Sequence, residues 1–148
     1  MIALRIAALL TILAAGTAAH AQQAARVQPV VPQPRQQDKI FPLGSSWIAV
    51  SLNGRPFTGD RPSFTLNQQF RATGFGGCNT YSATAIPLRE QSLAIGPFAL
   101  TKKSCGKDVM ALEQAFLVAL RTAAKWQQQG STLVLQSPNG ELRFERAL

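Results

Sequence analysis

One segment of this 148-residue chain carries a helical repeat of apolar residues, and most of its other patterned segments alternate with the two-residue period of a strand. The helical segment runs from about residue 108 to residue 124, with Asp108 at the position of an N-cap. Its apolar side chains recur at steps of three and four and predict one buried face, formed by Val109, Leu112, Phe116, Ala119, Leu120 and Ala123. The chain is therefore expected to fold around a single main helix.

Period-two alternation predicts strands on both sides of that helix. In the first, residues 45–52, the side chains of Trp47, Ala49 and Ser51 share one face. Asn53-Gly54 is a strong turn sequence, and another turn is expected at residues 137–140. The other expected strands are 63–66, 70–73, 81–86, 92–95, a segment at Trp126, 132–136 and 141–145. Several antiparallel strands with one helix predict an α+β fold.

The first 21 residues have the order of a secretory signal peptide. Arg5 supplies the basic start, residues 6–15 are mainly apolar, and small residues lead up to Ala21. The alternative, a membrane anchor, needs about 20 apolar residues, and Gly16 and His20 interrupt this run too early. We expect cleavage after Ala21 and a periplasmic or secreted product with no transmembrane segment after processing. The first cysteine is Cys78, so no lipid acceptor adjoins the apolar run.

Residues 22–43 are rich in Gln and Pro and show neither a helical nor a strand period. We interpret them as a disordered tether, and a Pro-rich ligand for a partner protein is the alternative. The folded part is expected over residues 44–148. That length fits one domain, which we expect to be a monomer.

Signal-peptide cleavage would also remove the only histidine, His20, and the loss of Arg5 lowers the net charge from +8 to +7. Without an imidazole the domain has no histidine to act as a general base, complete a triad or bind a metal. No nucleophile motif or close carboxylate pair can be assigned either. We therefore expect a protein that is not an enzyme, with no catalytic residues, metal or cofactor.

Cys78 and Cys105 are the only cysteines, and an even pair in an exported chain predicts a disulfide. A redox-active pair is the alternative, but the Cys-x-x-Cys spacing is missing. A zinc site would lack ligands, because two thiolates without histidine cannot complete a tetrahedral set. The bond is expected to pin the glycine-rich loop at residues 74–79 to the segment that leads into the helix.

An ordered set of short motifs resembles the META domain family, which is found in the heat-shock protein HslJ. The set consists of Trp47, Ser51-Leu-Asn-Gly54, Gly76-Gly-Cys-Asn79, Tyr81, Thr101-Lys-Lys-Ser-Cys105, Glu113, Phe116 and Leu142-Arg-Phe144. The resemblance covers about residues 44–148. It implies an antiparallel sheet curled into an open barrel packed with one helix, similar in shape to secretion-system pilotins. It also implies an envelope protein without established enzymatic activity, associated with heat-shock response, drug tolerance or motility.

Two groups of residues are candidates for a ligand or partner surface. Asn79 and Tyr81 either cap a turn and pack on the sheet or line a ligand cleft. Lys102, Lys103 and Lys107 cluster before the helix, where its dipole disfavours cations. Anionic lipid head groups or the phosphates of lipopolysaccharide could hold these lysines there, and an ordinary solvated surface is the alternative. Nucleic acid is not expected, because the protein is exported and the cluster has no interleaved aromatic residues.

The preferred hypothesis is a stress-related binding or protective module of the cell envelope. Its ligand would be a peptide, an anionic lipid or a partner protein. An open barrel leaves an apolar cleft, which we expect to be lined by Trp47, Phe64, Phe116 and Leu120. The alternative hypothesis is an inhibitor of an envelope or host hydrolase, of the protease or lysozyme type, that inserts the loop at residues 74–79 into the enzyme's cleft.

Overall fold

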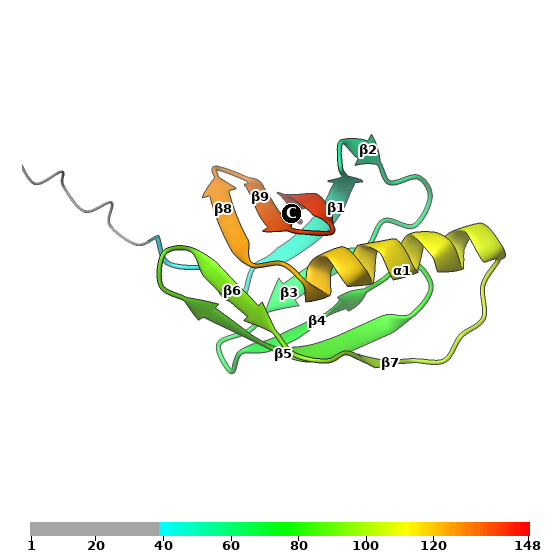
Figure 1. The fold of residues 1–148 in the computed structure, drawn as a ribbon, viewed down its shortest axis with the longest axis horizontal. Coiled ribbons are helices and arrows are strands. Elements are labelled where there is room, and N and C mark those ends of the chain that lie inside the picture. The colour runs from blue at the N-terminus through cyan, green and yellow to red at the C-terminus, as the bar shows by residue number, and fades with distance from the viewer. Residues whose placement is uncertain (1–38) are drawn as a thin grey trace, which may run out of the picture. The chain divides into compact units, whose positions relative to one another are not determined.

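The computed structural model describes residues 39–148, so the expected signal peptide and residues 22–38 of the expected tether lie outside the described residues. Ten strands and one helix follow one another along this part of the chain (Figure 1). The elements are β1 (Ser46–Leu52), β2 (Arg55–Pro56), β3 (Ser63–Leu66), β4 (Arg71–Phe75), β5 (Thr80–Leu88), β6 (Ser92–Ile95), β7 (Ala99–Leu100), α1 (Lys107–Arg121), β8 (Lys125–Gln129), β9 (Thr132–Ser137) and β10 (Gly140–Arg146).

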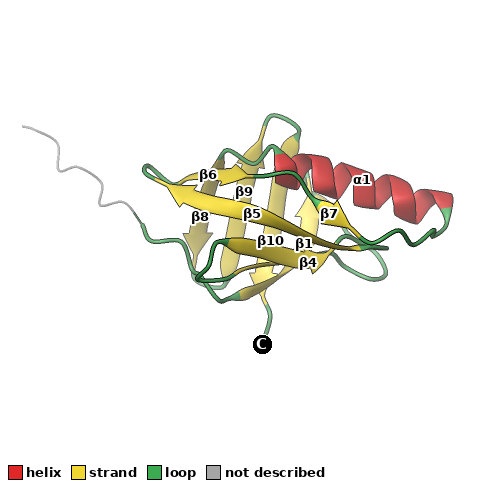
Figure 2. Cartoon of the chain, turned by 90° about the horizontal axis from the view of Figure 1, so that it is seen from below, coloured by secondary structure: helices red, strands yellow, loops and turns green. Residues whose placement is uncertain are grey.

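The strands form an antiparallel barrel that is closed. The pairing order is β10-β9-β8-β6-β5-β4-β3-β1, and β10 then pairs with β1 to complete the ring. Figure 2 shows these strands curled around a common interior, with α1 against one side. The fold is thus mostly β with one helix, and the expectation of an open barrel is corrected to a closed one. Both edges of β1 are used, because it pairs with β3 as well as with β10.

The alternation seen in the sequence explains the closure. Trp47, Ala49 and Ser51 of β1 are buried, as are Leu142 and Phe144 of β10. In the β1–β10 register Ala49 lies opposite Phe144 and Leu52 opposite Leu142. Pairing these two strands therefore places both apolar faces in one interior.

One seam of the barrel is weak. β6 and β8 pair only through Ser92 and Lys125. Beyond Ile95 the chain leaves the line of β6 and forms β7, which pairs with β5 through Leu100 and Ala99. The two-residue strands β2 and β7 are not predicted from the sequence, because two residues cannot display a period.

The helix differs from its predicted form at both ends. It begins at Lys107 with Gly106 as N-cap, and no side chain caps it. Asp108 is therefore in the first turn, where its negative charge suits the helix dipole, and the prediction of Asp108 as N-cap is wrong. Arg121 ends the helix three residues before the predicted end. Of the predicted stripe, Phe116, Ala119, Leu120 and Ala123 are buried, Leu112 is partly buried and Val109 is exposed.

The interior is built from large aromatic and aliphatic side chains. Phe116 of α1 and Phe144 of β10 have ring centroids 6.3 Å apart, and Phe64 of β3 lies 6.1 Å from Phe144 on the same measure. The largest fully buried side chains include both tryptophans, Trp47 and Trp126. Within residues 39–148, α1 does not have the length and apolarity of a membrane-spanning helix.

The closure can be tested at the start of β10. Gly140 has φ +138°, and a Cβ there would lie 2.7 Å from Oδ1 of Asn53, the atom that accepts the backbone N–H of Glu141. Gly140→Ala should lower the free energy of unfolding by about 3 kcal/mol, from backbone strain and this clash. Gly130→Ala is the control, because Gly130 also has positive φ (+57°) but nothing within 4 Å of its Cβ position.

For Gly130→Ala we expect a loss of about 1 kcal/mol, from backbone strain alone. Urea unfolding of both variants measures the difference. Equal losses would show that the β1–β10 junction does not depend on this close contact.

Candidate functional site

A carboxylate is buried where α1 faces the glycine-rich loop. Glu113 is 4% exposed and belongs to the inner face of α1. Its Oε2 accepts hydrogen bonds from the backbone N–H groups of Cys78, at 2.9 Å, and Asn79. Its Oε1 accepts a third from Nδ2 of Asn79, at 2.8 Å. These donors satisfy the carboxylate, so it can be buried without a cation beside it.

Asn79 connects this carboxylate to the segment that leads into the helix. Its Oδ1 accepts hydrogen bonds from Oγ1 of Thr101 (2.9 Å) and the backbone N–H of Lys103 (2.7 Å). Its Nδ2 also donates to the carbonyl oxygen of Lys103, at 3.3 Å. The side chain of Asn79 is buried and its polar atoms are engaged in holding three chain segments together.

The disulfide joins the same segments covalently. Cys78 and Cys105 are bonded, with their Cα atoms 6.1 Å apart. Closing a loop of this length is worth about 3–4 kcal/mol in the chain-entropy model. The glycine-rich loop is thus held by a disulfide on one side and by Glu113 on the other. Gly76 must lack a side chain, because a Cβ there would lie 2.8 Å from Oε2 of Glu113.

Two opposing effects act on the ionisation of Glu113. Burial disfavours the charged form, and the hydrogen bonds from the Asn79 side chain, the Asn79 backbone and the Cys78 backbone favour it. Together the hydrogen bonds outweigh the effect of burial, so the pKa of Glu113 is lowered. The carboxylate is therefore charged at neutral pH and acts as an acceptor, with no proton available for acid catalysis.

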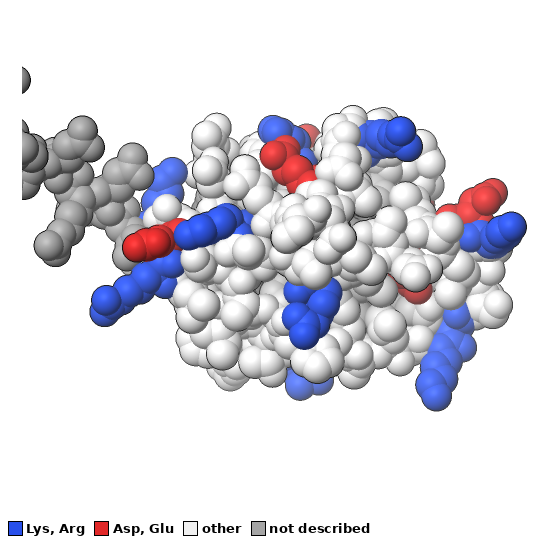
Figure 3. Space-filling model, in the orientation of Figure 1, with Lys and Arg blue, Asp and Glu red and all other residues white. Residues whose placement is uncertain are grey.

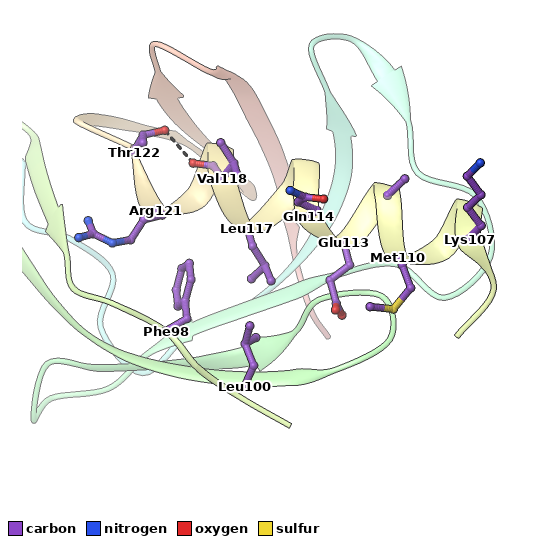
Figure 4. Close-up of a pocket in the computed structure, with 11 residues that line it drawn as sticks. Phe98, Leu100, Lys107, Met110, Glu113, Gln114, Leu117, Val118, Arg121 and Thr122 are labelled. Atoms are coloured by element: carbon purple, nitrogen blue, oxygen red, sulfur yellow. Dashed lines mark hydrogen bonds between the residues drawn. The ribbon is translucent and has the colours of Figure 1, made fainter. Parts of the chain in front are cut away.

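Next to this network lies an apolar groove between α1 and the segment around β7. Its volume is about 730 Å³. Phe98 and Leu100 form one wall, and Leu117, Glu113 and Met110 point toward them from α1 (Figure 4). The remaining lining residues are Lys107, Ala111, Gln114, Val118, Arg121 and Thr122. Leu100 and Val118 both line the groove and are 44% and 43% exposed, which is high for apolar side chains.

Charged side chains lie mainly at the ends of this groove. Figure 3 shows a surface over α1 that is largely uncharged, with basic side chains around it and an acidic side chain beside a basic one at the right-hand end, where α1 begins. Lys107 and Arg121 extend outward at opposite ends of the helix (Figure 4). The guanidinium of Arg121 donates to the carbonyl oxygen of Ile95. The helix surface between these two residues carries Ala111, Ala115 and Val118, all exposed.

The structure divides the candidate surface residues into two sets. Asn79 and Tyr81 are 3% exposed, so neither forms part of an open ligand surface. The Tyr81 hydroxyl donates to the carbonyl oxygen of Ser63 at 2.7 Å, and burial raises the pKa of Tyr81. Lys102, Lys103 and Lys107 are all exposed, and the backbone of Lys103 is held by Asn79.

The residues expected to line the cleft are in the core instead. Trp47, Phe64, Phe116 and Leu120 have no exposed surface, and none of them lines the groove. The reason is the closure of the barrel, which covers the interior that an open barrel would leave accessible. The groove lies outside the barrel wall, between α1 and the segment around β7.

Sequence reasoning did not identify Glu113 as the central polar residue, although a signal was present. Glu113 lies four residues before Leu117 and three before Phe116, which places a charge on the apolar stripe of the helix. Such a charge must find partners within the fold. Among residues 39–148 there is no group of His, Cys, Asp and Glu side chains that could bind a metal ion.

The network around Glu113 predicts a pH-dependent stability. Glu113→Gln replaces an acceptor by an amide that cannot accept from all three donors. We expect its free energy of unfolding at pH 7 to be about 1–3 kcal/mol lower than that of the unchanged protein. Because the pKa of Glu113 is lower in the folded state, its contribution is present above the unfolded pKa of about 4.3 and is lost as the pH falls through the folded pKa.

Chemical unfolding between pH 3 and pH 7 measures this difference. It should be largest near neutrality and should shrink below about pH 4. Glu145→Gln, at an exposed position on β10, is the control and should change stability little at any pH. A Glu113→Gln difference that stays constant from pH 7 to pH 3 would rule out the carboxylate as its source.

Comparison with solved structures shows the same fold in other bacterial proteins. A protein from Burkholderia xenovorans, determined by NMR, is 23% identical with a TM-score of 0.57, over 79% of this chain and 99% of that one. A DUF4847 family protein from Bacteroides vulgatus is 16% identical with a TM-score of 0.52, over 68% of this chain and 91% of that one. At these identities the likeness concerns the fold alone.

No curated protein matches the chain. The model of the META domain family matches residues 41–147, which include every strand and the helix of the structure. The chain therefore belongs to the META domain family.

Proposed function

We propose that this protein is a non-catalytic binding module of the bacterial envelope, and that the groove between α1 and β7 holds the apolar part of its ligand. The observation that carries the proposal is the groove itself. Its volume of about 730 Å³ falls within the range of about 300–1,000 Å³ that is typical of small-molecule sites. Its walls are mainly apolar, and several of the side chains that form them are exposed to solvent.

The polar groups near the groove support binding rather than catalysis. Glu113 accepts three hydrogen bonds from the fold, Asn79 is engaged by three chain segments, and the Tyr81 hydroxyl donates to a backbone carbonyl. No histidine occurs in the sequence after His20. A nucleophile paired with a base would need groups that are free to exchange protons, and Glu113, Asn79 and Tyr81 are committed to the fold.

The envelope location rests on two observations of different kinds. The first 21 residues have the sequence pattern of a signal peptide. The disulfide between Cys78 and Cys105 suits an oxidising compartment. The family resemblance adds envelope stress as the setting in which capture of an apolar molecule would be useful.

The hydrolase-inhibitor hypothesis gains no support from the loop on which it depends. An inhibitory loop must project into the enzyme's cleft, whereas Gly76, Cys78 and Asn79 are buried against α1. We therefore do not pursue it as the function.

The binding proposal can be tested with a neutral apolar dye, N-phenyl-1-naphthylamine, whose fluorescence rises in apolar sites. Val118→Asn places a polar amide in the groove wall and should weaken binding about tenfold, through the loss of roughly 1–1.5 kcal/mol of apolar contact. Val109→Asn is the matched control. Val109 is on the same helix and is 39% exposed, compared with 43% for Val118, but does not line the groove.

The control should bind the dye as the unchanged protein does, with a single saturable site. Circular dichroism would verify that both variants keep the fold. Dye binding that fails to saturate, or that weakens equally in the two variants, would contradict a binding function for the groove.

A further inference from the structure

We propose that the ligand of the groove is a single-chain amphiphile with an anionic head group, such as a long-chain carboxylate or a lysophospholipid. This inference rests on the proposed function and specifies the ligand class. The apolar chain would lie along α1 between Met110 and Val118. The head group would lie at the end of the groove where Lys102, Lys103 and Lys107 are found.

The shape of the groove suits a chain. Its lining residues on α1 extend from Lys107 to Arg121, the full length of the helix. At 1.5 Å per residue this wall is about 20 Å long. The opposite wall is shorter and is formed by Phe98 and Leu100. The ring of Phe98 is fixed by Tyr81, with centroids 5.2 Å apart, so this wall is preformed.

The polarity of the lining favours an acyl chain over a peptide. A peptide would bring backbone N–H and C=O groups that need partners, and each one left unpaired costs about 1–3 kcal/mol. Beyond the exposed amide of Gln114 the middle of the groove offers few partners, because Glu113 already accepts three hydrogen bonds and Oγ1 of Thr122 is bonded to the carbonyl oxygen of Val118. β7 has only two residues, which is too short an edge to pair with an extended peptide. An acyl chain makes no such demand.

The charges assign the two ends of the ligand. Lys102, Lys103 and Lys107 are exposed, and they lie just before and at the start of α1. The backbone hydrogen bonds between Lys103 and Asn79 fix this basic segment beside the groove. At the other end, the guanidinium of Arg121 is already engaged by the carbonyl oxygen of Ile95. Lys107 extends outward, and its flexible four-carbon stem allows its ammonium group to turn toward a head group.

The test compares anionic and cationic amphiphiles of matched chain length. Alkyl carboxylates with chains of eight, twelve and sixteen carbons, and alkyltrimethylammonium ions of the same lengths, are titrated below their micelle concentrations by displacement of the neutral dye. Carboxylate affinity should rise with chain length, by at most about fourfold for each added methylene. At equal length the carboxylate should bind about tenfold more tightly than the ammonium ion.

A set of variants separates the head-group contact from the apolar contact. In the triple variant Lys102→Gln, Lys103→Gln, Lys107→Gln, carboxylate binding should weaken about tenfold, while binding of the neutral dye stays unchanged. The control variant Lys39→Gln, Arg89→Gln, Arg143→Gln removes the same total charge from residues outside both the groove and the segment that connects β7 to α1. It should leave both affinities near those of the unchanged protein.

The outcomes distinguish this inference from the proposed function. Equal affinity for carboxylate and ammonium ligands, or equal effects of the two triple variants, would overturn the anionic-amphiphile inference while dye binding still supported the groove. Loss of all saturable binding, dye included, would overturn both. Tighter binding of an extended apolar peptide than of the sixteen-carbon carboxylate would overturn the inference in favour of a peptide ligand. Binding only to phosphatidylglycerol vesicles, and to no monomeric amphiphile, would overturn it in favour of a membrane-surface contact.

Discussion

The hydrogen bonds that the Glu113 carboxylate accepts from residues 78 and 79 connect the one helix of this domain to its barrel. α1 contributes an apolar face to the core, but an apolar face alone permits sliding and rotation. A charged acceptor with three directed donors permits one position. Asn79 in turn accepts hydrogen bonds from Thr101 and Lys103, which fixes the segment before the helix. The disulfide adds a covalent link between the same segments. The lysines before α1 are held in place by this arrangement.

The groove is a consequence of where the helix is held. α1 packs against β9 and β10 on one flank. On its other flank the chain departs from β6 at Gly96 and continues as β7, beside β5. The space between α1 and β7 is lined by Leu117 and Phe98 at the margin of the core and by the exposed side chains of Leu100 and Val118. A stable domain can thus carry an apolar surface without exposing its own core.

The sequence was sufficient to predict the longer strands and the helix, but not the helix ends or the two-residue strands β2 and β7. Alternation located the main strands, and the three- and four-residue spacing of apolar residues located the helix, because both periods follow directly from backbone geometry. The disulfide followed from two cysteines and an export signal. Closure of the barrel could not be predicted, since it depends on β1 pairing at both edges, and alternation fixes the faces of a strand but not its neighbours. This is also why Trp47 and Phe64 were placed in a cleft when the closed barrel buries them.

The candidate site was predictable only in part, for the same reason. Glu113 is visible in the sequence as a charge on an apolar stripe, but its donors are 34 and 35 residues away and are brought to it only by the tertiary fold. Asn79 was considered from the sequence as a candidate for a ligand surface beside the loop. Its side chain is buried, so it holds chain segments together instead of facing a ligand. Of the three lysines that were placed before the helix, Lys102 and Lys103 precede it, whereas Lys107 is its first residue. Their relation to a groove required the positions of Phe98 and Leu100.

The most direct test of the account is to locate a bound chain by NMR. In the complex with a twelve-carbon carboxylate, intermolecular nuclear Overhauser effects should connect the methylene protons of the ligand to the methyl groups of Leu100, Leu117 and Val118. The carboxylate end should shift the amide signals of Lys103 and Lys107. Contacts confined to the outer face of β8, β9 and β10, or the absence of any contact with these three methyl-bearing residues, would contradict the groove as the binding site.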